Sequence, residues 1–132
     1  MSKLNRRTFI ATSALTLGAT ATSFAMETEK PVLVHHVFFW LKNPSSLEDR
    51  TKLIEGVKTL SKIETIRMLR VGVPASTEKR PVVDSSYAVS ELIYFDDLAG
   101  QSVYQDHPIH KKFIENCSHL WEKVVVYDSI DA

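Results

Sequence analysis

Cysteine and glycine, on which many functional sites depend, are scarce in this sequence. Cys117 is the single cysteine among 132 residues, so the chain can form neither an intramolecular disulfide nor a cysteine-based zinc site. We expect this residue to be a small apolar helix residue. The four glycines form no phosphate-binding loop, and no nucleophile elbow or metalloprotease motif is present. Any active site must therefore be built without these motifs.

An excess of charge of one sign is also missing. The 16 basic and 16 acidic residues give a net charge of zero, but Lys3, Arg6 and Arg7 are the only charges in the first 25 residues. The remainder has 13 basic and 16 acidic residues, a net charge of −3. A mildly acidic domain offers no basic surface to nucleic acid or to an anionic membrane. We therefore expect no nucleic-acid partner, and no membrane partner once the first 25 residues are removed.

The first 25 residues follow the order of a secretory signal. Arg6 and Arg7 precede a weakly apolar run over 10–24, and Ser23 and Ala25 are small residues at the positions that a signal peptidase reads. The arginine pair and the low hydrophobicity favour the twin-arginine route. The run lacks the ~18 strongly apolar residues that a membrane anchor needs. We predict a twin-arginine-type signal peptide over 1–25 and an exported domain, periplasmic or secreted, over 26–132.

Four strands are predicted in the rest of the chain. An almost continuously apolar run over 31–41 is typical of a strand that is covered on both faces. In the second strand, the alternation between apolar and polar residues changes phase, which indicates a bulge. In the third strand, Tyr87, Val89 and Phe95 are expected on one face. The strands are expected at 31–41, 64–73, 87–95 and 123–130.

Helices are predicted between these strands. Ser45 and Glu48 form a capping box that opens the first helix. Asp96 and Asp97 are good caps for a short helix, and Pro108 begins a further helix whose apolar residues continue to Trp121. The resulting order, β-α-β-β-α-β, is typical of an α+β, ferredoxin-like fold with one antiparallel sheet and helices on one face.

The first strand has an apolar face that the helices cannot cover. His36, Phe38 and Trp40 are expected to point away from the helices, because side chains alternate along a strand. A domain of this size has no second layer to bury them. An exposed apolar stripe of this kind indicates a partner, most simply a homodimer with its sheets packed together.

Three segments carry a family resemblance: 35–42, 87–96 and 104–110, the last containing the His-Pro-x-His step from His107 to His110. From about Val32 to Ile130 the chain resembles the stress-responsive dimeric α/β-barrel family. The resemblance implies a ferredoxin-like protomer and a dimer whose two sheets form a barrel.

The same resemblance implies candidate site residues. The family includes plant stress proteins with no established reaction and a plant polyketide cyclase that closes a ring by an intramolecular aldol condensation. The wider superfamily includes haem-degrading and quinone-forming monooxygenases. Similarity to the cyclase implies catalytic roles for Tyr104 and His110, with His35 nearby. A further histidine of the cyclase corresponds to Val89 here, which departs from the cyclase pattern.

The residues themselves support a cleft with acid–base chemistry. His110 lies in the first turn of a helix, where the dipole disfavours imidazolium, so a neutral imidazole can act as a base. Tyr104 precedes the Pro108 break, and its hydroxyl can hold an enolate oxygen. Apolar walls with few polar groups suit an aromatic or acyl ligand. We expect five ligand-contacting residues: His35, Val37, Phe39, Val89 and His107.

Simpler roles remain open for the histidines. His107 can serve only as a helix cap, and His35 can be a core histidine. A metal site at His35 and His110 would need a carboxylate, for which Glu91 is the only strand candidate. We expect no metal and no cofactor.

Two functions of different class follow. The first is a small-ligand-binding, stress-associated domain that binds an apolar or aromatic compound without turnover. The second is a cofactor-free cyclase, isomerase or monooxygenase that acts on an aromatic or polyketide-like substrate. A cavity lined by Tyr104, His110 and His35 would favour the second. A cleft filled by Phe39, Phe95 or Trp121 would favour the first.

Replacing Arg6 and Arg7 together by Lys should trap the precursor in the cytoplasm, because the twin-arginine route requires the arginine pair. Fractionation and immunoblotting of wild type and double variant measure this. Normal export of the double variant would exclude the twin-arginine route.

Overall fold

The computed structural model describes residues 30–132, and the predicted signal peptide lies outside the described residues. The order of the elements confirms the predicted fold. The elements are β1 (Leu33–Leu41), α2 (Leu47–Lys58), η1 (Thr59–Lys62), β2 (Ile66–Gly72), β3 (Val89–Phe95), α3 (Leu98–Asp106), α4 (Pro108–Cys117), η2 (Ser118–Leu120) and β4 (Trp121–Ile130). No helix within residues 30–132 is long and apolar enough to span a membrane.

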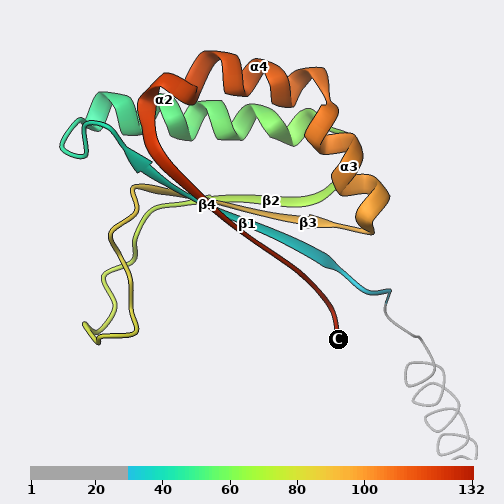
Figure 1. The fold of residues 1–132 in the computed structure, drawn as a ribbon, viewed down its shortest axis with the longest axis horizontal. Helices are drawn as coiled ribbons and strands as arrows, with labels where there is room; N and C mark the ends of the chain where they lie inside the picture. The colour runs from blue at the N-terminus through green and yellow to red at the C-terminus, as the bar shows by residue number, and fades with distance from the viewer. Residues whose placement is uncertain (1–29) are drawn as a thin grey trace, which may run out of the picture. The chain divides into compact units, whose positions relative to one another are not determined.

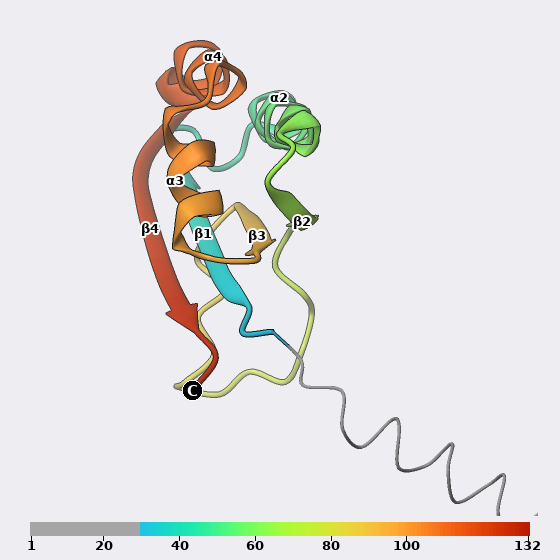
Figure 2. The ribbon, with the colours of Figure 1, turned by 90° about the vertical axis from the view of Figure 1, so that its right-hand side faces the viewer.

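The four strands form one antiparallel sheet in the order β2-β3-β1-β4. The helices α2, α3 and α4 all lie on one face of this sheet (Figures 1 and 2). The predicted bulge in the second strand is present, since the register between β2 and β3 shifts between Ile66 and Met68. Within residues 30–132 the helices therefore cover one side of the sheet, as the ferredoxin-like order predicts.

Two local predictions about the helices are wrong. The cap of α2 is Ser46, which accepts a hydrogen bond from the Asp49 backbone N–H at 3.1 Å, whereas Ser45 donates to Asn43. The last helix ends at Cys117, because Trp121 pairs with Leu41 and thereby joins β4. In both cases the predicted helix forms, but its observed start or end lies a few residues from the predicted position.

The core lies between the sheet and the helices. Alternate residues of β1 and β3 are buried against α2 and α4. The two helices approach each other closely at Gly56, where an added Cβ would overlap the Cys117 sulfur and lie 3.2 Å from the Phe113 ring. Glycine is required at this position by the close approach, and Cys117 is the small buried residue that was predicted.

The opposite face of the sheet carries an aromatic cluster, which we call the aromatic outer face. Its members are His36, Phe38, Trp40, Tyr87 and Tyr127. The Phe38 ring lies 4.9 Å from the Tyr87 ring, and the Tyr127 side chain is 66% exposed. The placement of Tyr87 with Val89 is wrong, because Tyr87 precedes the first residue of β3 and turns to the outer face.

Gly56→Ala should lower the free energy of unfolding by up to about 2 kcal/mol. Overpacking costs ~1–3 kcal/mol, and the better helix propensity of alanine returns about 1 kcal/mol. Urea unfolding measures the change. The control is the same substitution in a Cys117→Ala background, where the sulfur is gone and the loss should be smaller. An equal loss in both backgrounds would contradict the proposed contact.

Candidate functional site

A cavity of about 220 Å³ lies between the inner face of the sheet and the helices α3 and α4. We call it the site cavity. Four of its lining residues are titratable: His35 of β1, Glu91 of β3, Tyr104 of α3 and His110 of α4. Since these residues come from four separate elements, the cavity exists only in the folded chain.

The Tyr104 hydroxyl donates a hydrogen bond to Glu91 Oε1 at 2.8 Å. Both side chains are only 1% exposed. Burial and the neighbouring Glu91 raise the pKa of Tyr104 above its ordinary value. The phenol is therefore neutral, and it acts as a hydrogen-bond donor rather than as a base.

Glu91 is an acid in an apolar position of the sheet. It lies in the middle of β3, between Val37 of β1 and Val71 of β2. Burial raises the pKa of Glu91 from 4.5 to about 7, against the smaller lowering effect of the Tyr104 hydrogen bond. At neutral pH a substantial fraction of this carboxyl group is protonated.

A hydrogen bond from one ring nitrogen orients His110 and leaves the other nitrogen able to accept a proton. Its Nδ1 lies 3.1 Å from the Gln105 carbonyl oxygen. A carbonyl oxygen can only accept, so Nδ1 carries the proton and Nε2 keeps its lone pair. Burial lowers the pKa of His110, and the ring centroid lies 4.5 Å from that of Tyr104. The side chain is thus a neutral imidazole with an available base nitrogen.

His35 forms a second polar pair in the same cavity. Its Nδ1 lies 2.6 Å from Asp128 Oδ1, across the β1–β4 pairing. Its ring centroid is 5.4 Å from that of Tyr104. Asp128 is half exposed, so this pair reaches from the buried cavity to solvent. The carboxylate fixes the orientation of the imidazole.

The mouth of the cavity is apolar. Ile114 of α4 and Val124 and Val126 of β4 line it and are partly exposed, between 38% and 45%. The Trp121 ring packs 5.0 Å from the Phe39 ring and forms part of the wall without filling the space. An apolar ligand can therefore enter between α4 and β4.

The structure brings together most of the residues predicted for the site. His35, Val37, Phe39, Tyr104 and His110 all line the cavity. Two predicted ligand contacts are not among its lining residues. Val89 is fully buried in the core. His107 caps α4 by accepting from the Ile109 N–H at 3.1 Å, and its Nε2 lies 3.1 Å from Glu64.

Sequence reasoning missed Asp128 and considered Glu91 only as a metal ligand. The sequence did contain a signal for a functional role of Glu91, because this acid occupies an apolar position in the alternating pattern of β3. Acidic side chains are rarely buried unless they have a partner or a function. Within residues 30–132, no group of three or more His, Cys, Asp or Glu side chains is arranged to hold a metal ion.

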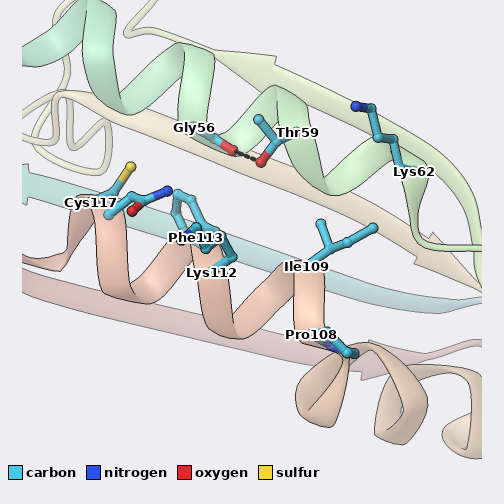
Figure 3. A pocket seen from close by; sticks show the side chains of 9 residues that line it. Gly56, Thr59, Lys62, Pro108, Ile109, Lys112, Phe113 and Cys117 are labelled. Carbon is cyan, nitrogen blue, oxygen red and sulfur yellow. Dashed lines mark hydrogen bonds between the residues drawn. The ribbon is translucent and has the colours of Figure 1, made fainter.

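A larger hollow of about 430 Å³ lies elsewhere, between α4 and the segment that carries Gly56, Thr59 and Lys62 (Figure 3). Its walls include Ile109 and Phe113, and the Thr59 hydroxyl is engaged with the Gly56 carbonyl oxygen at 2.6 Å. No histidine or carboxylate lines it. This hollow therefore lacks the buried histidines and carboxyl group that line the smaller site cavity.

Known structures share this fold. The chain is similar to a Dabb family protein with a ferredoxin-like fold from Mesorhizobium loti, with 28% identity, a TM-score of 0.63, and coverage of 77% of this chain and 98% of that one. A dimeric protein of unknown function from Bacteroides fragilis has 21% identity, a TM-score of 0.57, and coverage of 74% and 94%. A hydroxynitrile lyase from Passiflora edulis has 19% identity, a TM-score of 0.65, and coverage of 79% and 96%.

No functionally curated protein sequence matches the chain. The model of the stress-responsive A/B barrel domain matches residues 33–131, which is the whole of the sheet and its helices. Because this match covers most of the chain, and the ferredoxin-like topology agrees with it, the chain belongs to the stress-responsive A/B barrel domain family.

Proposed function

We propose that this protein is a cofactor-independent enzyme that transfers protons on a small aromatic or acyl compound. The observation that carries the proposal is the convergence of His35, Glu91, Tyr104 and His110 on one cavity. Titratable groups gathered in a buried cavity, with perturbed pKa values, are typical of active sites. The cavity is lined by these groups rather than filled by aromatic rings, which favours catalysis over binding alone.

The size of the cavity limits the ligand. A water molecule occupies about 30 Å³ in the liquid, and a protein cavity of ~150 Å³ can hold benzene. At about 220 Å³, the site cavity has room for one substituted ring or a short acyl chain. A larger substrate would have to extend past Ile114 and Val126 at the mouth.

The geometry suggests a division of roles. His110 Nε2 accepts a proton from a carbon atom beside a carbonyl group, and Tyr104 holds the oxygen on which negative charge develops. The Asp128-oriented His35 supports a second proton transfer on the solvent side of the cavity. This pair of roles suits an isomerase, a lyase or a cyclase.

The resemblance to a hydroxynitrile lyase agrees with this reaction class at the level of the fold only. That enzyme is 19% identical to this chain. A shared fold shows that the scaffold can carry a lyase site, and it assigns no residue here.

Ligand binding without turnover is the second candidate. The apolar walls, which include Val37, Phe39 and Trp121, favour it, because they would hold an aromatic compound without any reaction.

His110→Ala should lower the turnover of a single-ring aromatic or short acyl carbonyl compound by ~10²–10⁴-fold, the usual effect of removing a general base. Tyr104→Phe should lower it less. In the wild type, kcat/KM should rise as His110 deprotonates, and this limb should lie below pH 6.5 because burial lowers the pKa of His110. Steady-state assays across pH measure both effects.

The matched control is His119→Ala, which removes an exposed histidine of η2. Equal rates for the His110 variant and this control would exclude His110 as the base. Compounds that bind in calorimetry and are never converted would favour the binding function.

We also propose that the homodimer forms through the aromatic outer face, with His36, Phe38 and Trp40 at its centre. Structural relatives from Bacteroides fragilis and Thermobifida fusca are described as dimeric. In this chain Lys123 Nζ lies 4.6 Å above the Trp40 ring, which is a further contact on that face. Packing two such faces together would remove these aromatic rings from water, which favours this arrangement.

Trp40→Ala should dissociate or unfold the dimer, since deletion of a large aromatic from a packed interface costs roughly 3–5 kcal/mol. Sedimentation velocity and thermal unfolding measure this. Val103→Ala, on the helical side, should leave the dimer intact. A stable dimer of unchanged melting temperature in the Trp40 variant would exclude this interface.

Export remains part of the proposal. The Arg6–Arg7 pair and the small residues at Ser23 and Ala25 support a twin-arginine signal, and we propose that the domain acts in the periplasm or outside the cell.

A further inference from the structure

The carboxyl group of Glu91 is buried, and among residues 30–132 no lysine or arginine lines the site cavity beside it. The Tyr104 hydroxyl donates to one of its oxygens. The β-sheet neighbours on either side are the apolar Val37 and Val71. The residues that α2 buries, Leu53 and Val57, are also apolar.

The titratable groups around Glu91 come from the other elements of the cavity. They are His35 of β1, Tyr104 of α3 and His110 of α4, with Asp128 of β4 behind His35. Burial lowers the pKa of His110, so its imidazole is neutral at neutral pH and does not offset a negative charge on Glu91. An ionised carboxylate with one hydrogen bond is costly in such a position. In agreement, burial raises the pKa of Glu91 to about 7.

The protonation state of Glu91 decides which acceptor the Tyr104 hydroxyl hydrogen can bind. Tyr104 has one hydroxyl hydrogen. An ionised Glu91 can only accept hydrogen bonds, so the Tyr104 hydrogen is engaged in the bond to the Glu91 carboxylate. A protonated Glu91 can donate its own hydrogen to the Tyr104 oxygen. The Tyr104 hydrogen is then free to bind an oxygen atom of a ligand in the cavity.

We propose that Glu91 is the acid of this site, and that in its neutral form it lets Tyr104 donate to the carbonyl oxygen of an uncharged aldehyde or ketone. This inference deepens the proposed function and rests on it for the chemical step. The site then discriminates against carboxylate ligands, because no lysine or arginine among residues 30–132 lines the cavity to pair with them and the Glu91 carboxyl group is already there.

The chemical step balances within these residues. His110 Nε2 takes a proton from the carbon beside the carbonyl, and the C–H electron pair becomes the new C=C bond. The carbonyl oxygen uses the π electron pair of the C=O bond to take the Tyr104 proton. The Glu91 proton then passes to the Tyr104 oxygen. The products are an enol, a Glu91 carboxylate and a His110 imidazolium, and return of the protons restores the enzyme.

The first test measures the protonation of Glu91 in the ligand-free full-length protein. Infrared spectra of wild type should contain a carboxylic-acid carbonyl band that titrates with a midpoint near pH 7, as the raised pKa requires. Glu91→Gln should lose this band, and Glu115→Gln, at an exposed site of α4, should keep it. Absence of such a band from wild type above pH 5.5 would overturn the proposal.

The second test uses two probes of similar size, acetophenone, which is a neutral ketone, and benzoate, which is an anion. If only protonated Glu91 permits binding, wild-type affinity for acetophenone should fall roughly 30-fold between pH 6 and pH 8.5. Benzoate should bind more weakly throughout. Glu91→Gln should bind acetophenone with little pH dependence, because the amide donates at every pH.

The outcomes separate this inference from the proposed function. Wild-type affinity for acetophenone that does not change with pH, or tighter binding of benzoate, would overturn the role of Glu91. A Glu91-dependent pH profile would support that role even if the His110 experiment showed no turnover. In that case the proposed catalysis would fail while the selection of neutral carbonyl compounds would stand.

Discussion

The pairing of β1 on both of its edges is the constraint on which the rest of the structure depends. Antiparallel registers with β3 and β4 fix which side chains of β1 face the helices and which face away. Because the side-chain period of a strand is two, a slip of one residue would exchange His35 with His36 and Phe39 with Trp40. The same register holds the site cavity on one face and the aromatic outer face on the other.

The alternation of β1 was readable from the sequence, and so was the order of the elements. Local signals were sufficient for the bulge in β2, the cap by His107 and the start of α4 at Pro108. The failures are also local. Ser45 and Ser46 are adjacent candidates for one cap, and the sequence alone does not favour the correct one.

The polar partners of the site were harder to predict because they are distant in sequence. His35 and Asp128 are 93 residues apart, and only the β1–β4 register brings them together. Glu91 and Tyr104 are closer, but their contact requires α3 to fold back over β3. At Val89, where similarity to the cyclase would require a histidine, this chain is apolar, and it carries an acid two residues further along the same face. The residues on this face of β3 therefore depart from the pattern that the resemblance to the cyclase implies.

The close approach of α2 and α4 at Gly56 also affects the sulfur chemistry of the protein. It covers Cys117, whose side chain is 6% exposed, and burial raises the pKa of the thiol. Thiol exchange and oxidation require an accessible thiolate, and this packing limits the access to the sulfur and disfavours its ionisation. The lone sulfhydryl is thereby protected from mixed disulfides with glutathione or with other proteins. Burial of this one sulfur therefore makes its oxidation in the folded domain slow in either redox environment.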